Sequence, residues 1–187
     1  MNGNLAYQEE FREELLNGKI YMMSSPSVNH NRTASNIYYI FRNYLKGKSC
    51  EAFADGTDVY LTEDDRVIPD VMIVCDKNII KPDGIHGAPD LVVEVLSPGT
   101  AKNDRGYKKD LYENTGVKEY WLVDPTVRSI EAYLLSNGKY NLDGFYGIFP
   151  DSLGLTDKER EESKKEISVS LYDDFNIPLE EIFYNLF

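Results

Sequence analysis

Residues 89–100 hold the feature that most limits how this chain can fold, a carboxylate in the middle of a continuous apolar run. The run, residues 91–96, is too short for a typical helix and rich in β-branched residues, so it predicts a strand buried on both faces. An ionised carboxylate inside such a strand is unfavourable unless a cation or strong hydrogen bonds compensate it. We therefore expect this residue, Glu94, either to pair with a buried Lys or Arg or to ligate a metal.

Length and composition predict one globular domain over residues 1–187, with a charged, helix-permissive surface insertion at 151–166. A chain of this length buries roughly 68–70% of its unfolded surface, so it needs neither metal nor disulfide merely to fold. No apolar run approaches the ~18 residues of a membrane span, and residues 1–18 lack a signal-peptide pattern. Cys50 and Cys75 lie in apolar strand-like segments away from any metal-ligand pattern. This favours reduced thiols in a cytoplasmic protein.

The net charge of −12 argues against a surface that attracts polyanions throughout. It does not exclude local binding of nucleic acid. Several acidic residues lie in the late charged insertion, and a site that holds divalent cations itself needs negative charge.

Hydrophobic periodicity and turn residues predict an α/β fold with a mixed central sheet flanked by helices. The strand at 91–96, the helix after it and the strand at 118–124 make a right-handed crossover with parallel strands. Asn137-Gly138 predicts a hairpin. The expected helices are 7–17, 28–45, 101–115 and 179–186, and the expected strands are 19–23, 50–61, 67–74, 91–96, 118–124, 128–135, 139–145 and 167–171.

The strand predicted at 67–74 contains Pro69-Asp70, which is unusual for a central strand. Proline lacks a donor for the ladder and aspartate is a poor strand former. An edge or a bulge beside a functional site explains both residues.

The helix predicted at 101–115 has two distinguishable faces. Lys108 shares one face with Leu111 and Tyr112 at spacings of three and four residues, whereas Lys109 falls on the other. We therefore expect Lys108 to point toward the sheet and Lys109 toward solvent.

Asp70, Glu94 and Lys108 are thus expected to converge, from two neighbouring strands and the helix that follows the second. Carboxylate oxygens are the ligands of Mg²⁺ or Mn²⁺, and an ammonium beside a phosphate positions or activates the attacking water. This combination indicates metal-assisted chemistry at a phosphate.

With these residues in place, the sequence resembles the PD-(D/E)xK nuclease superfamily, Pro69-Asp70 matching its PD element and Glu94 its second acidic position. The xK half of the motif is missing, since Leu96 follows Glu94 by two residues. Lysines that have moved to the following helix are known in that superfamily. Three further segments resemble a large bacterial family of restriction-endonuclease-like proteins, and the likeness extends from residue 7 to about 145. These segments are residues 94–98, residues 104–108 followed by Tyr112, and residues 116–125.

The resemblance implies further site residues. It adds the Val95 carbonyl as a metal ligand, Glu14 as an outer ligand or water positioner, and His30 and Tyr112 as secondary candidates. On the sequence pattern alone, Glu14 is instead a solvated charge beside an apolar helical stripe, and His30 is a structural residue at a helix start. Tyr112 is expected to pack against and orient Lys108.

The predicted function is Mg²⁺- or Mn²⁺-dependent hydrolysis of DNA phosphodiester bonds. Lys102, Arg105 and Lys109 are candidates for DNA contacts, with Arg32 and Arg42 as contributors. The acidic balance and the displaced lysine favour an alternative, a non-catalytic interaction protein that keeps the fold. Residues 97–100 before a helix could bind an anion, although a structural capping loop fits better. A homodimer or higher homo-oligomer is left open.

Overall fold

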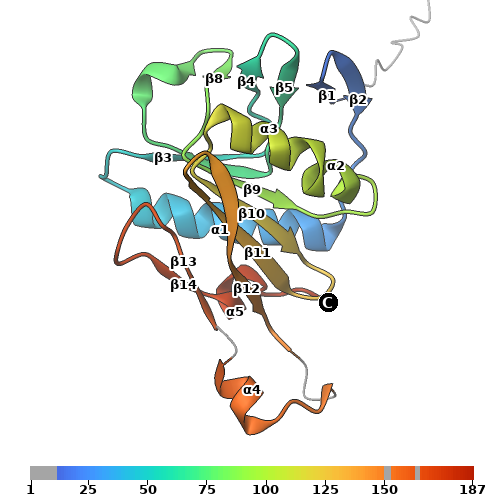
Figure 1. Ribbon diagram of the computed structural model, residues 1–187, viewed down its shortest axis with the longest axis vertical. Helices are drawn as coiled ribbons and strands as arrows, with labels where there is room; N and C mark the ends of the chain where they lie inside the picture. The colour runs from blue at the N-terminus through green and yellow to red at the C-terminus, as the bar shows by residue number, and fades with distance from the viewer. Residues whose placement is uncertain (1–11, 150–152, 163–164) are drawn as a thin grey trace, which may run out of the picture.

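The computed structural model describes residues 12–149, 153–162 and 165–187, which form a mixed α/β structure (Figure 1). A six-stranded sheet lies at its centre, with the strand order β12-β11-β10-β9-β6-β3. Its strands are β3 (Glu51–Ala54), β6 (Val71–Val74), β9 (Leu91–Val95), β10 (Glu119–Asp124), β11 (Ser129–Ser136) and β12 (Lys139–Gly147). β9 and β10 pair in parallel, while β6 and β11 run antiparallel to them. The predicted mixed sheet and its parallel crossover are confirmed.

Strand β9 is buried at all five positions, as predicted, and divides its side chains between two hydrophobic cores. Its odd-numbered residues pack with α1 (Val28–Leu45) in one core. Val92 packs on the opposite face with residues of α3 (Tyr107–Thr115) in the other core. Because side chains alternate along a strand, Glu94 points to the same face as Val92, toward α3.

The helices flank the central sheet, α1 on one side and α2 with α3 on the other (Figure 1). α1 has its predicted bounds and is capped by Ser27, whose hydroxyl accepts a hydrogen bond from the His30 N–H. The helix predicted at 101–115 is interrupted at Gly106, which separates α2 (Ala101–Arg105) from α3. Gly116 ends α3 at a φ of 93°, a left-handed conformation that glycine adopts without strain. Among the described helices, none is long and apolar enough to cross a membrane.

A second six-stranded sheet, with the order β2-β1-β5-β4-β8-β7, contributes to the core beneath α3. Its strands are β1 (Glu13–Leu16), β2 (Lys19–Met22), β4 (Val59–Thr62), β5 (Asp65–Val67), β7 (Ile80–Lys81) and β8 (Gly84–His86). A 3₁₀ turn, η1 (Lys77–Ile79), precedes β7. The segments expected as single strands at 50–61 and 67–74 each divide, because the chain leaves the central sheet for this second one.

The helix predicted at 7–17 is wrong over its described part, which forms β1. Asn17 and Gly18 have φ values of 51° and 69°, and they form the turn of an antiparallel hairpin that pairs β1 with β2. Asn-Gly is a strong hairpin signal, because both residues tolerate positive φ. Residues 7–11 of that prediction lie outside the described residues.

The C-terminal part closes the face of the sheet that carries α1. β13 (Glu166–Ser168) and β14 (Asn176–Pro178) form a hairpin, followed by α5 (Leu179–Ile182). β13 is shorter than the strand predicted at 167–171, and α5 is shorter than the helix predicted at 179–186. The buried Glu119 accepts hydrogen bonds from the Trp121 indole and from the Ser170 N–H and hydroxyl, so it ties this part to β10. α4 (Asp157–Glu162) lies within the predicted charged segment.

Cys50 and Cys75 are bonded to each other, so the expectation of two reduced thiols is wrong. They stand next to β3 and β6, whose antiparallel register pairs Glu51 with Val74. One step further along this register places the cysteines opposite each other, with their Cα atoms 3.9 Å apart. The disulfide therefore joins an edge strand to its neighbour in the central sheet.

Candidate active site

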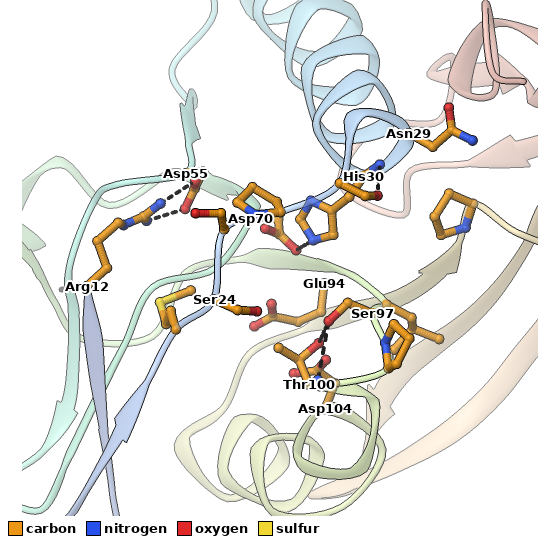
Figure 2. Close-up of a pocket in the computed structure, with 18 of the residues that line it drawn as sticks. Arg12, Ser24, Asn29, His30, Asp55, Asp70, Glu94, Ser97, Thr100 and Asp104 are labelled. Carbon is orange, nitrogen blue, oxygen red and sulfur yellow. Dashed lines mark hydrogen bonds and ion pairs between the residues drawn. The ribbon is translucent and has the colours of Figure 1, made fainter.

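Four buried acidic residues, Glu14, Asp70, Glu94 and Asp104, line one pocket, and Figure 2 shows the last three of them. Asp70 immediately precedes β6, and Glu94 lies on the neighbouring β9. Glu14 comes from β1 of the second sheet, on the same strand face as the buried Leu16, and Asp104 comes from α2. All four are buried, although carboxylates are rarely buried without partners.

Lys108 is the cation at the centre of these carboxylates. Its Nζ lies 2.7 Å from Glu94 Oε1, 2.9 Å from Glu14 Oε1 and 3.6 Å from Asp104 Oδ1. The residue is only 3% exposed, whereas Lys109 lies over the Tyr133 ring on another side of α3. The predicted inward direction of Lys108 is confirmed, but Lys109 is half-buried against Tyr133 rather than directed into solvent.

Burial and charge perturb this cluster strongly. Burial raises the pKa of Glu94 well above its usual range, and the carboxylates of Asp104, Asp70 and Glu14 raise it further, against the opposing effect of Lys108. Burial alone would lower the pKa of Lys108, but Glu94 and Glu14 outweigh it and raise that pKa. One ammonium among several carboxylates leaves an excess of negative charge on the pocket floor.

Asp70 is held against the end of β9. Its Oδ2 accepts a hydrogen bond from the Val95 N–H at 2.7 Å and lies 3.4 Å from His30 Nε2. Pro69, just before it, has no N–H to donate to β9, so the backbone ladder ends beside the site. His30 thus reaches the pocket, and its buried Nδ1 has no hydrogen-bond partner among the described residues. Burial alone would lower the pKa of His30, but the contact with Asp70 outweighs this and raises it.

Glu14 is buried rather than solvated, so the interpretation from the sequence pattern alone is wrong for this residue. Its Oε1 accepts hydrogen bonds from Lys108 Nζ and from the Ile68 N–H, each at 2.9 Å. β1 pairs with β5 within the second sheet, and the Glu14 carboxylate extends from this sheet to Lys108 of α3. Glu14 therefore anchors the second sheet to the site.

Tyr112 holds Glu94 rather than Lys108, which corrects the role expected for it. Its hydroxyl donates a hydrogen bond to Glu94 Oε1 at 2.7 Å, and the side chain is fully buried. The same carboxylate oxygen therefore receives Lys108 and Tyr112 together. These two contacts fix the direction in which Glu94 points.

Replacing Tyr112 by phenylalanine is expected to lower the free energy of unfolding by about 1.5–3 kcal/mol, the usual worth of a hydrogen bond to a charged group. Denaturant unfolding measures the change. Tyr140→Phe is the matched control, because the Tyr140 hydroxyl donates to the neutral Val117 carbonyl at 2.8 Å. A loss near 1 kcal/mol is expected there. Equal losses in the two variants would contradict a charged acceptor at Tyr112.

The pocket above these groups has a volume of about 810 Å³. Residues 23–27 form one wall and residues 96–100 another. Ser97 and Thr100 are joined by a hydrogen bond between their hydroxyls, and Ser97 also accepts one from the Thr100 N–H, so residues 97–100 form a capped turn. Arg12, at the mouth, is paired with Asp55 (Figure 2).

The three basic residues predicted to contact DNA do not line this pocket. Lys102 is exposed on α2, and Arg105 lies 2.6 Å from Glu131 of β11. Arg32 and Arg42 bind the Asn185 carbonyl and the Tyr38 hydroxyl instead. A basic cluster along one helix in sequence therefore does not become a basic cleft.

Asp104 is the site residue that the sequence analysis missed. It is 1% exposed, and its Oδ1 has no hydrogen-bond partner among the described residues. Burial raises the pKa of Asp104, with Lys108 opposing that rise. The signal that could have found it is its i, i+4 spacing to Lys108 on the inward side of the helix.

The donor atoms at this site suit a hard divalent cation. Asp70 and Glu94 supply carboxylate oxygens, and the Val95 carbonyl lies on the Asp70 side of β9, because the N–H and C=O of one strand residue point the same way. Among the described residues, no three His, Cys, Asp or Glu side chains already stand as a metal-binding group. Mg²⁺ characteristically uses one or two carboxylates and keeps water or substrate phosphates as its other ligands. Two carboxylates and a carbonyl therefore fit it.

This fold and this cluster of carboxylates around a lysine define a nuclease-like α/β protein. The chain belongs to the Uma2 family, described as "Putative restriction endonuclease", which matches residues 4–158. The resemblance stated from the sequence is thus confirmed.

The chain is similar to two Synechocystis sp. proteins, both named as uncharacterized. It is 35% identical to slr1290 over 133 residues, 69% of this chain and 70% of that protein. It is 25% identical to sll1609 over 126 residues, 65% of this chain and 71% of that protein.

A solved structure shares the fold. It is described as "a putative nuclease belonging to DUF820" from Anabaena variabilis, with a TM-score of 0.68 and 16% identity over 91% of this chain and 89% of that one. The predicted restriction-endonuclease-like α/β fold is confirmed by this match.

Proposed function

We propose that this protein is a divalent-metal-dependent endonuclease that hydrolyses DNA phosphodiester bonds. The observation that carries the proposal is the excess of buried carboxylates around one lysine on the pocket floor, with Glu94 on β9 and Asp70 just before the neighbouring strand β6. Burying so many like charges destabilises a fold unless a cation compensates them. The family to which the chain belongs supports a nuclease-like activity.

In this proposal Asp70, Glu94 and the Val95 carbonyl hold Mg²⁺ or Mn²⁺. Such a cation polarises a phosphate and lowers the pKa of the attacking water. Tyr112 keeps Glu94 directed at the site, and the Val95 N–H keeps Asp70 there. Both contacts preorganise the ligands before a cation arrives.

Lys108 acts as an electrostatic stabiliser. The carboxylates of Glu94 and Glu14 raise its pKa against the effect of burial, so it is charged at neutral pH and is no general base. Its ammonium stands where negative charge develops on a phosphate bound at the pocket floor. Glu14, which is held by the Ile68 N–H, positions the attacking water. His30 holds Asp70 through the contact of its Nε2 with Asp70 Oδ2.

Cleavage of supercoiled plasmid and of single-stranded DNA is expected to require Mg²⁺ or Mn²⁺ and to fall by roughly 10²–10³ in Asp70→Asn, the scale seen when one electrostatic group is removed. Incubating the purified protein with each substrate, with either metal or with a chelator, tests this by gel electrophoresis.

Asp90→Asn is a closely matched control. Asp90 also follows a proline, is 8% exposed like Asp70, and accepts a backbone hydrogen bond at 2.7 Å, from Cys75. It lies outside the pocket, so its variant should cleave like the wild type. Equal activity in Asp70→Asn and Asp90→Asn would indicate a contaminating nuclease. Absence of cleavage by the wild type with every metal and substrate would favour the non-catalytic interaction protein.

A further inference from the structure

A site rich in carboxylates needs an accessible cation if its substrate is an anion. Among the described residues that line the pocket, the basic ones are Arg12, His30 and Lys108, and their side chains are 41%, 11% and 4% exposed. His30 and Lys108 lie against the buried carboxylates of the pocket floor. Of these three groups, Arg12 is therefore the one that a phosphate can reach without entering the floor.

The backbone directs Arg12 toward the pocket. Its carbonyl accepts a hydrogen bond from the Met23 N–H at 2.8 Å, which extends the β1–β2 register by one step beyond the pair of Glu13 and Met22. Because side chains alternate along an extended chain, Arg12 lies on the same side of this hairpin as Glu14. Both residues line the pocket, Glu14 buried at the floor and Arg12 exposed at the mouth.

The Arg12 guanidinium binds Asp55, which lies in the loop between β3 and β4. Two of its nitrogens donate to different oxygens of this carboxylate, Nη1 to Oδ2 at 2.6 Å and Nη2 to Oδ1. The hydrogen bonds to Asp55 raise the pKa of Arg12 against the effect of burial, and the charge of Asp70 adds to the rise. Figure 2 shows the pair on the Asp70 side of the pocket. Arg12 is thus within electrostatic reach of a proposed metal ligand.

This two-point contact is also the one that arginine makes with a phosphate. The planar guanidinium binds two oxygens of either group through a pair of parallel hydrogen bonds. Asp55 therefore stands where two phosphate oxygens would bind. The pair opens easily, because its side chains are 41% and 32% exposed and exposed ion pairs contribute little to stability. When a phosphate replaces Asp55, the freed carboxylate returns to water.

We infer, resting on the nuclease function proposed above, that Arg12 is a phosphate-binding residue at the pocket mouth, which holds a DNA backbone phosphate next to the one being cleaved, and whose guanidinium Asp55 occupies until DNA displaces it. Asp55 competes with the substrate, so its carboxylate weakens DNA binding. Neither residue touches the reacting phosphate. The pair therefore controls affinity, while the groups on the floor control the chemical step.

Fluorescence anisotropy with Ca²⁺ as the divalent ion measures binding of a labelled duplex of about 20 base pairs and of one of its strands. We expect Arg12→Gln to weaken binding about tenfold, the scale of one hydrogen-bonded contact to a charged group. Asp55→Asn should tighten binding about threefold, the scale of one exposed ion pair. The double variant should bind within about twofold of Arg12→Gln alone, because Asp55 then has no arginine to compete for.

Salt dependence separates a phosphate contact from a general change of charge. Loss of one contact makes the slope of log K against log salt shallower by about 0.9 on duplex DNA and about 0.7 on a single strand. Arg12→Gln should show this change. Arg66→Gln and Asp58→Asn are matched controls, because this ion pair lies outside the pocket and its side chains are 28% and 29% exposed. Both controls should leave the affinity and the slope nearly unchanged.

Cleavage with Mn²⁺ provides a second readout. Arg12→Gln should raise KM about tenfold and change kcat less than about twofold, because a contact made equally in the ground state and the transition state affects binding alone. Asp55→Asn should lower KM. Arg12→Lys keeps the charge but not the two-point contact, so it should bind between the wild type and Arg12→Gln. Thermal melting of each variant checks that it folds.

The outcomes separate the two proposals. If Arg12→Gln binds and cleaves like Arg66→Gln, or if Asp55→Asn weakens binding as Arg12→Gln does, the inference is overturned and the nuclease proposal stands. A lower kcat of Arg12→Gln at unchanged KM would also overturn the role assigned to Arg12. Binding that responds to both residues as expected, without cleavage by Mg²⁺ or Mn²⁺, would support the phosphate site and overturn the enzyme. Absence of binding to both forms of DNA would overturn both proposals.

Discussion

Replacing Lys108 by methionine is expected to lower the free energy of unfolding by about 3–5 kcal/mol, because it leaves several buried carboxylates without their cation. Methionine keeps the length of the apolar stem, so the change removes charge with little loss of volume. Glu94, Glu14 and Asp104 would then face one another unpaired. Since the carboxylates raise the pKa of Lys108, its stabilising effect is complete at pH 7 and is lost only as pH rises above the usual value of 10.5.

Denaturant unfolding at pH 7 with a chelator present measures this loss. Lys118→Met is the matched control, because Lys118 Nζ also lies close to a carboxylate, 2.6 Å from Asp90 Oδ1, but its side chain is 64% exposed. An exposed pair contributes at most about 1 kcal/mol. Similar losses in the two variants would show that Lys108 does not compensate the buried carboxylates. DNA cleavage by Lys108→Met should also fall, by roughly 10²–10³.

Much of this site could be predicted from local periodicity. The two-residue alternation of β9 places Glu94 on one face of a buried strand, and the 100° turn per helical residue separates Lys108 from Lys109. Both features depend only on neighbouring residues and on the regular geometry of one element. Glu94 and Lys108 therefore meet because the helical segment of α2 and α3 directly follows β9 in the chain.

Features set by pairing between distant segments could not be predicted in the same way. Leu15, with Tyr7 and Phe11, fits a helical spacing, yet the described part of this segment becomes β1 because it pairs with β2 and β5. The Cys50–Cys75 disulfide depends on the register of β3 and β6. Arg105 contacts Glu131, which lies on β11 and is 26 residues later in the chain.

The Asn17-Gly18 turn was the exception, because its hairpin signal is local. The spacing of Tyr7, Phe11 and Leu15 favours a helix over residues 7–17, and this signal disagrees with the turn. Where two local signals disagree, positive φ at two successive residues is the more restrictive requirement, since few residue pairs tolerate it. Glu14 nevertheless reaches the site, from a strand rather than a helix.

Replacing Glu94 by glutamine is expected to stabilise the metal-free protein while it removes metal-dependent cleavage. Burial and the neighbouring carboxylates raise the pKa of Glu94 well above 4.5, so the ionised form destabilises the fold. The cost is absent below pH 4.5, grows as pH rises above that value, and is complete once pH exceeds the folded-state pKa. Glutamine keeps the shape and still accepts a hydrogen bond from Tyr112.

The free energy of unfolding of Glu94→Gln should therefore equal that of the wild type near pH 4 and exceed it at pH 8, by about 1–3 kcal/mol, the range seen when buried ionic groups are replaced. Adding Mn²⁺ at 100 times its dissociation constant should stabilise the wild type by about 2.7 kcal/mol and the variant far less. Denaturant unfolding across this pH range, with chelator or Mn²⁺, measures both effects. Glu119→Gln is the control, because Glu119 is buried with a raised pKa, caused by burial, but binds Trp121 and Ser170 outside the pocket. If Mn²⁺ stabilised Glu94→Gln as much as Glu119→Gln, Glu94 would not be a metal ligand, and its burial would need another compensating partner.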